Sequence, residues 1–303
     1  MNINPIIEKD LKTKLRGWRS TILISSYVLL LILILLLFFA GNNMIGPQYN
    51  INSFNPRIAV NGFNLLITFQ FALLFLAVPA LTATAISNER ERQTLDLMLV
   101  TQIPSRKIIL GKITVSLAHT MLMVVASLPV IGVVFFFGGI GFPDILKLLL
   151  FYIVTGFFVA SCGVFFSTVF KKNITSIITT YIFLGLITFG PFIGLVVYAL
   201  LSERVTHTGF APVYGTYAAT LFPSPVFGFL SLYFSGSSSG AYYGGGVGVV
   251  SSMAQEIQNM ISMETGIWRY MQPWLVNGLF DVVASFLLIL FSSIILNPVK
   301  RKR

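Results

Sequence analysis

The stretch from Thr21 to Ala40 contains 20 consecutive residues without a charged side chain, and most of them are Leu, Ile, Val or Phe. A helix rises about 1.5 Å per residue, so roughly 20 apolar residues cross the hydrocarbon core of a bilayer. Comparable apolar stretches recur at about 63–87, 113–137, 148–170, 174–201 and 274–296. Together these stretches predict an all-α, polytopic membrane protein with six transmembrane helices.

The composition supports this class. Hydrophobic residues make up 55% of the 303 residues and charged residues only 10%, whereas soluble domains average about 25% charged residues. The alternating segments of about ten residues that mark a transmembrane β-barrel do not occur. The first apolar stretch is too long for a signal peptide, and no small-residue cleavage site follows it, so we expect a retained first span.

Several residues inside the predicted spans indicate how the helices are shaped and packed. Pro79, Pro129 and Pro191 are expected to form tolerated kinks, because neighbouring helices can satisfy the freed backbone groups. The third helix is expected to begin near Pro104, before the membrane, and the fifth is long enough to tilt. Gly190 and Gly194 form a small-xxx-small pair in the fifth span, which predicts close packing against another helix.

The distribution of basic residues predicts the orientation. Six spans place both termini on one side, and the segments on that side contain 16 of the 20 Lys and Arg residues. Cytoplasmic segments are the basic ones, so both termini are expected in the cytoplasm and the chain in the plasma membrane. The positive charge is divided among short separate segments, including the tail 300–303, and does not indicate nucleic-acid binding.

Two further regions complete the predicted organisation. In residues 1–20, Ile3, Ile7, Leu11, Leu15 and Trp18 recur at helical spacing, which predicts an amphipathic helix in the membrane interface. The alternative is an ordinary basic flank of the first span.

The segment 202–272 is expected to be a loop with short helices outside the cell, followed by the last span and the basic tail in 273–303. Its uncharged part, 217–234, contains Pro223 and Pro225, which argue against a regular helix. It is expected either to be a re-entrant or interfacial piece of this outer loop or to pack as a hydrophobic loop on the spans. The Gly/Ser-rich stretch 235–248 predicts a flexible connection, and 251–265 predicts a short amphipathic helix.

The stretch 88–112 contains eight charged residues between two apolar spans. Glu89, Arg90, Glu91 and Arg92 are consecutive, and each charge would cost about 3 kcal/mol at the centre of a bilayer. The chain must therefore leave the membrane here.

The same stretch also has the pattern of a helix near 88–102. Asn88 is a favourable N-cap with Glu91 three residues later, and Leu95, Met98 and Leu99 form one apolar face. That face needs a cover, which is either the membrane surface and the protein's own helix ends or a soluble partner.

Three stretches, "NPIIEKDLKTKLRGWRS", "ERERQTLDLML" and "PSRKIILGK", resemble the permease subunits of ATP-binding-cassette (ABC) exporters of the type-2 class. That family has an interfacial N-terminal helix, six spans and a Glu-Arg-x-x-x-Thr-Leu-like stretch after span two. The counterpart here, from Glu91 to Leu95, has a shorter gap. The resemblance implies a cytoplasmic coupling helix that docks on an ABC ATPase subunit. The residues implied in that contact are Glu89, Arg90, Glu91, Arg92, Thr94, Leu95 and Met98.

The same resemblance implies the remaining partners. These are a second permease copy or a sister permease, and membrane lipids. ATP and Mg²⁺ are expected on the partner subunit, because the ATP-binding pattern of Gly, four residues and Gly-Lys-Ser/Thr is missing here. Arg106 stands in place of the first Gly, and Gly111–Lys112 is followed by Ile113. We expect no enzyme activity and no cofactor in this chain, and no metal site, because Cys162 and the two histidines lie apart.

Asp281 is the one acidic residue expected inside a span, and such residues are functional hypotheses by default. It is therefore the candidate for an intramembrane polar site, with contact to outer water or to another helix as the alternatives. His119 is expected to be a packing residue. Two other functions remain open from the sequence: an ion-driven secondary transporter, for which Asp281 would be the coupling residue, and a regulatory permease-like subunit.

Overall fold

The computed structural model describes residues 18–42, 56–94, 104–136, 141–206, 221–235 and 272–296. Every regular element in these ranges is a helix. The elements are α2 (Trp18–Gly41), α3 (Pro56–Thr82), α4 (Ser87–Glu91), α6 (Ser105–Phe136), α7 (Phe142–Val169), α8 (Asn173–Thr206), α10 (Pro225–Ser235) and α12 (Pro273–Leu296). Six of them are long and apolar enough to cross a membrane, which confirms the prediction of an all-α, polytopic membrane protein.

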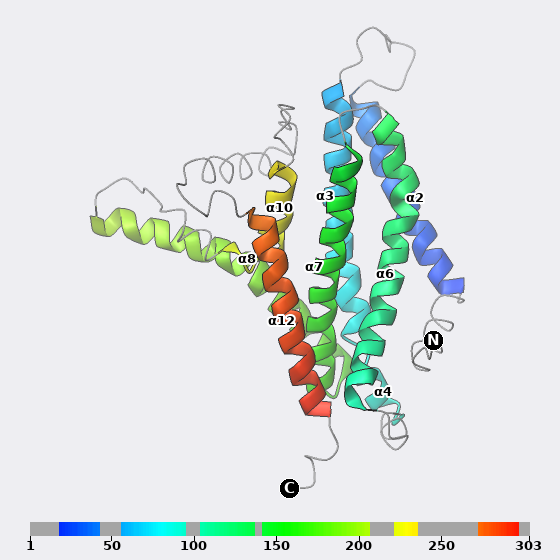
Figure 1. Ribbon diagram of the computed structural model, residues 1–303, viewed down its shortest axis with the longest axis vertical. Coiled ribbons are helices and arrows are strands. Elements are labelled where there is room, and N and C mark those ends of the chain that lie inside the picture. Colours follow the sequence, from blue (N-terminus) through cyan, green and yellow to red (C-terminus); the bar gives the residue numbers. More distant parts are fainter. Residues whose placement is uncertain are drawn as a thin grey trace.

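The long helices form a bundle around α7 (Figure 1). α7 packs against α3, α6, α8 and α12. In the most apolar stretch of α7, 67% of the residues are buried, whereas only 17% are buried in the corresponding stretches of α2 and of α8. α7 is therefore the central helix, whereas α2 and α8 lie at the periphery, and the C-terminal part of α8 leans away from the bundle in Figure 1.

An aromatic cluster joins three elements inside the bundle. The rings of Phe71 on α3 and Phe229 on α10 stack with centroids 4.5 Å apart, and Phe151 of α7 lies next to both. The Tyr152 hydroxyl of α7 donates a 2.8 Å hydrogen bond to the Ile67 carbonyl of α3. Since a buried Tyr needs a partner for its hydroxyl, this bond fixes α7 against α3.

The uncharged segment 217–234, where it is described, forms the short helix α10 packed on the spans. Pro225 starts this helix and Ser224 caps it, since the Phe227 N–H donates to the Ser224 hydroxyl oxygen at 3.4 Å. The Asn277 side chain of α12 donates to the Phe222 carbonyl at 2.7 Å. The expectation that the prolines prevent a regular helix is therefore wrong for this part, because Pro225 occupies the first helical position. At 11 residues, α10 is roughly 16 Å long and too short to span.

Several helix ends differ from the predicted ones: α3 runs from Pro56 to Thr82 and not over 63–87, and α7 begins at Phe142 and not near 148. α6 begins next to Pro104, as expected, and the three prolines lie inside their helices. α8 continues to Thr206, beyond the predicted end at 201. Trp18 belongs to the first turn of α2, so it is continuous with the first span. The rest of the predicted interfacial helix and the segments 236–248 and 251–265 lie outside the described residues.

A close contact between α7 and α3 depends on a glycine. A Cβ atom at Gly163 would lie 2.0 Å from Thr82 Oγ1 and 3.1 Å from the backbone nitrogen of Ala83. Both atoms are held, because the Thr82 hydroxyl donates to Val78 O at 2.8 Å and the Ala83 N–H donates to Pro79 O. Any larger side chain at position 163 must therefore separate the two helices.

We predict that Gly163→Ala lowers the stability of the purified protein by about 1–3 kcal/mol, the usual effect of overpacking a helix contact. Thermal unfolding in detergent measures the effect. Gly132→Ala is the matched control, because a Cβ at Gly132 of α6 meets nothing within 4 Å, so its midpoint should stay the same or rise. Equal midpoints for the two variants would show that α7 and α3 do not pack as closely as described.

Candidate functional site

The short helix α4 follows the turn after α3 and lies at one end of the bundle (Figure 1). Its first backbone N–H groups, those of Ile86 and Ser87, both donate to the Ser167 hydroxyl oxygen of α7 at 2.8 Å. The buried Ser87 hydroxyl donates to Asn173 Oδ1 of α8 at 2.6 Å. Because the first N–H groups of a helix lack partners within it, α7 supplies the cap that α4 does not supply itself.

The predicted N-cap at Asn88 is therefore wrong. Asn88 lies inside the first turn of α4, and its side-chain oxygen accepts a 3.3 Å hydrogen bond from Arg92 Nε.

The end of α4 is a left-handed turn. Gln93 has a φ of 60°, the Gln93 N–H donates to the Arg90 carbonyl and the Thr94 N–H donates to the Glu89 carbonyl. These two bonds define a Schellman C-terminal motif, in which Gly usually takes the left-handed position. The helix predicted near 88–102 therefore does not run on continuously from its charged start, and Leu95 and Met98 lie outside the described residues.

Two charged side chains of α4 bind the facing ends of α7 and α8. The Arg90 guanidinium donates to the Thr168 carbonyl at 3.0 Å and to the Phe170 carbonyl at 3.3 Å, at the end of α7. The Glu91 carboxylate accepts from the backbone N–H of Asn173 at 2.8 Å and from its side chain at 2.6 Å, at the start of α8. A cation at a helix C-terminus and an anion at an N-terminus are each favourable with the helix dipole.

The third charged side chain links α4 to α6. Glu89 Oε1 lies 3.1 Å from Lys112 Nζ, and Thr94 donates to the other carboxylate oxygen. Lys112 is only 8% exposed, and a buried ammonium group is costly unless it is paired and hydrogen-bonded. The pair therefore holds the start of α6 against α4.

We call these contacts the α4 junction. It consists of Glu89, Arg90, Glu91, Lys112, Ser167 and Asn173. Of the residues that the resemblance implies in the partner contact, Glu89, Arg90 and Glu91 bond within the chain, Thr94 bonds to Glu89, and Arg92 is exposed. Their contact with a partner stays a prediction. Sequence reasoning missed Lys112, Ser167 and Asn173 as members. Lys112, a single basic residue at the start of an apolar run, is the one signal that could have indicated a buried pair.

The predicted intramembrane site at Asp281 is buried in α12 at 0% exposure, so it does not reach water. Neither carboxylate oxygen has a hydrogen-bond partner among the described residues. Its polar neighbour on α7 is Thr155, whose hydroxyl is also without a partner there. Asn277, one turn earlier, holds α10 as described above, and His119 is buried on α6. A functional role for Asp281 stays a prediction.

The predicted helix contact at Gly190 and Gly194 is not made within the described part of the chain. A Cβ at Gly194 would meet nothing within 4 Å, and one at Gly190 only Leu186 of the same helix. This face of α8 is open in the single chain.

Six apolar helices and a polar junction at one end of them define the class, a multi-pass membrane protein. Residues 4–263 match the family described as "ABC-2 family transporter protein". The chain belongs to this family and is a transmembrane subunit of an ABC transporter, a translocation subunit that is not itself catalytic. This favours the ABC class over the ion-driven secondary transporter. A search of curated proteins found no match to the chain.

We predict that Glu91→Ala weakens the start of α8. Loss of an N-terminal cap costs about 0.5–2 kcal/mol, so amide hydrogen exchange in the first turn of α8, from Asn173 to Ser176, should become about tenfold faster. Arg92→Ala is the matched control, because among the described residues the side chain of this exposed neighbour bonds only to Asn88, and it should leave that exchange unchanged. The same exchange rate in Glu91→Ala and wild type would contradict the capping role.

Proposed function

We propose that this chain is a permease subunit of an ATP-driven ABC exporter and that its α4 segment receives a separate ATPase subunit on the cytoplasmic side. The observation that carries the proposal is the α4 junction. A segment between two spans is hydrogen-bonded at once to α6, α7 and α8, so a force on α4 acts directly on three membrane helices.

The residues near α4 divide into an inward and an outward set. Glu89 and Arg90 are partly buried and engaged with other helices, whereas Arg92 and Gln93 are exposed. The proposed contact with the ATPase consists of this outward set and the exposed edge of Glu91. In the sequence, Leu95 and Met98 continue it. The inward set transmits its movement to the bundle.

The charge distribution supports placing the α4 end in the cytoplasm. Basic residues near α4 and near the junction of α7 with α8 include Arg92, Lys107, Lys171 and Lys172, all exposed. At the other end of α7, Lys147 lies 3.7 Å from Asp144 and is neutralised by it. An excess of Lys and Arg marks the cytoplasmic side.

A second permease, either a copy of this chain or a sister chain, is proposed to pack against α8. The exposed side chains of α8 include Ile182, Leu186 and Phe189. The open face of α8 at Gly194 would allow a helix of the second permease to approach closely. The partner ATPase would bind ATP and Mg²⁺, and the nucleotide would shift the permease pair between states only through contacts that differ between them.

We predict that the full chain, purified from its native membrane in mild detergent, brings a stoichiometric ATPase subunit with it. Arg92→Glu should reduce the affinity for that subunit at least about tenfold, because reversing a charge in an interface creates a repulsion that costs several kcal/mol. Leu95→Asp should abolish co-purification. Binding is measured by titrating the labelled ATPase subunit into the reconstituted permease.

Lys172→Glu is the control, an equal charge reversal on an exposed residue between α7 and α8. It should change the affinity about twofold at most, because Lys172 is not part of the proposed contact and an exposed charge outside an interface contributes little. A wild-type chain that purifies alone with ATP present, or full affinity in both Arg92→Glu and Leu95→Asp, would contradict the proposed docking surface.

A further inference from the structure

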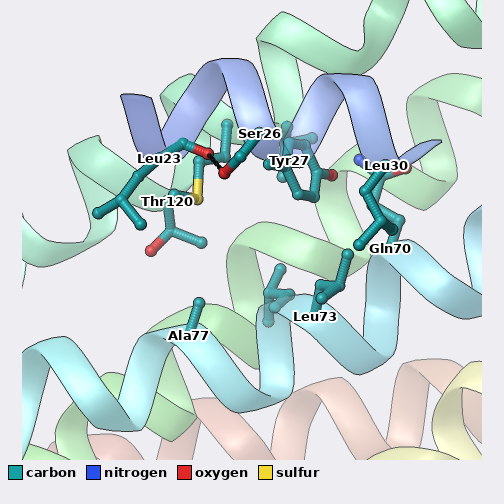
Figure 2. Close-up of a pocket in the computed structure, with 11 residues that line it drawn as sticks. Leu23, Ser26, Tyr27, Leu30, Gln70, Leu73, Ala77 and Thr120 are labelled. Carbon is teal, nitrogen blue, oxygen red and sulfur yellow. Dashed lines mark hydrogen bonds between the residues drawn. The ribbon is translucent and has the colours of Figure 1, made fainter. Parts of the chain in front are cut away.

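The polar side chains inside this bundle differ in the space around them. A cavity of about 260 Å³ lies between α2, α3 and α6, with Tyr27, Gln70 and Ala77 in its lining (Figure 2), and none of the described side chains that line it is acidic or basic. Asp281 of α12 lies outside this cavity, and its two carboxylate oxygens are fully enclosed by protein. Because no space is open at these oxygens, a molecule or a metal ion does not reach them in this conformation, whereas a proton needs no additional volume.

Among the described residues, no cation pairs with Asp281. α12 packs against α6, α7 and α10. On α7, the titratable group within electrostatic reach is the Cys162 thiol, which carries no positive charge. On α6, the buried Lys112 is paired with Glu89, and the other buried titratable residue is His119. The described side chains of α10 are all non-titratable. An ionised Asp281 would therefore be a buried and unpaired charge, which is strongly unfavourable.

The surroundings of Asp281 suit a neutral carboxyl group. A protonated carboxyl group has one O–H donor. The Thr155 hydroxyl, its polar neighbour on α7, has no partner among the described residues, so a proton on Asp281 supplies a donor for it across the contact between α7 and α12. The Ser285 hydroxyl donates to the Asp281 backbone carbonyl at 2.6 Å, and so it does not stabilise a charge on the carboxylate.

The part of α12 that carries Asp281 lies beside α10 (Figure 1). Asp281 is the ninth residue of α12, roughly 12 Å from its start. One turn earlier, the Asn277 amide donates to the Phe222 carbonyl at 2.7 Å and to the Ser224 carbonyl at 3.3 Å. The contact is so close that a Cβ atom at Gly228 of α10 would lie 2.1 Å from Asn277 Oδ1. Access of water to Asp281 from this end therefore requires α10 and α12 to separate.

We propose that Asp281 is an intramembrane proton-binding site, which holds a proton while α7, α10 and α12 are packed as in this structure and releases it when these helices separate and admit water. Water stabilises the ionised carboxylate, and an exposed Asp is ionised at neutral pH. Since the closed arrangement binds the proton and the open arrangement does not, a higher pH favours the open arrangement. The permease thus exchanges a proton with the solution when this part of the bundle opens.

Infrared spectroscopy of the full chain at neutral pH tests for the bound proton. The sample is kept in a detergent without ester groups, because the carbonyl bands of lipid esters overlap the signal. A protonated carboxyl group has a carbonyl stretching band that an ionised carboxylate lacks. The wild type should show this band, and carbon-13 at the aspartate carboxyl groups should shift it. Asp281→Asn, which keeps the shape and the neutrality of the group, should remove it.

A variant with Asp10, Asp96 and Asp144 all changed to Asn is the matched control, because Asp281 is then the one aspartate left in the chain. This variant should keep the carbon-13-shifted band at full intensity, and it keeps the test decisive if Asp281→Asn folds poorly. No such band in the folded wild type would show that Asp281 is ionised, and a band that survives in folded Asp281→Asn would belong to another residue. Either result would overturn the proposal.

Amide hydrogen exchange in α12, from Asp281 to Ser285, tests for proton release in lipid nanodiscs. After correction for the intrinsic effect of pH on exchange, the population of the open arrangement in the wild type should rise with pH, by at most about tenfold per pH unit, the limit for one released proton. In Asp281→Asn the open population should not depend on pH. The same pH dependence in both proteins would overturn the proposed release.

Gly228→Ala tests the cover that α10 provides. Its added Cβ must displace α10 from Asn277, so the open population should rise about tenfold, a usual effect of overpacking. Gly278→Ala is the matched control, because a Cβ there would lie 3.8 Å from Val154, an ordinary contact. Equal open populations in the two variants would overturn the role of α10. These measurements use the permease without the ATPase, so their result is independent of the proposed docking surface.

Discussion

The arrangement of this bundle depends on the placement of charge at two helix ends. α7 ends at Val169 and α8 begins at Asn173, so the carbonyl groups of one helix and the N–H groups of the next lie side by side without partners within their own helices. Arg90 satisfies the first set and Glu91 the second. Adjacent residues of opposite charge in α4 thus match the opposite dipoles of α7 and α8, which explains why a charged segment is stable against an apolar bundle.

Because α7 is the central helix, the contact of α4 with its end is connected to most of the bundle. α7 packs against α3, α6, α8 and α12, and α12 carries the buried carboxyl group of Asp281. A displacement at the end of α7 would therefore shift the helices packed against it, since a packed interior does not deform locally without a cost in free energy. The Glu89–Lys112 pair adds α6. In our proposal the ATPase subunit acts on the bundle through this set of contacts.

The sequence predicted the spans well and the contacts of α4 poorly, for physical reasons. α2 and α12 were predicted to within a few residues, because long uncharged runs have few alternatives to a membrane helix. The charges at Glu89, Arg90 and Glu91 predicted that the chain leaves the membrane here, but not their partners, which lie 23 to 82 residues away along the chain. The left-handed turn at Gln93 that follows α4 was also not predictable, since this position is usually marked by Gly. The short helix α10 was missed because Pro225 was treated as a breaker and not as a helix start.

The most direct test of the account is a pair of distance measurements by pulsed electron paramagnetic resonance on the permease–ATPase complex, with Cys162 replaced by Ala. One pair of spin labels replaces Asn88 in α4, a partly exposed residue outside the proposed ATPase contact, and Ile174 in the first turn of α8. A second pair replaces Ile174 and Ile295 near the end of α12, and both of these positions are exposed. The account predicts that ATP leaves the first distance unchanged and shifts the second, because α4 and α8 move as one unit. A shift in the first distance with the second constant would show that α4 moves without the membrane helices, and would contradict the α4 junction as the transmitting contact.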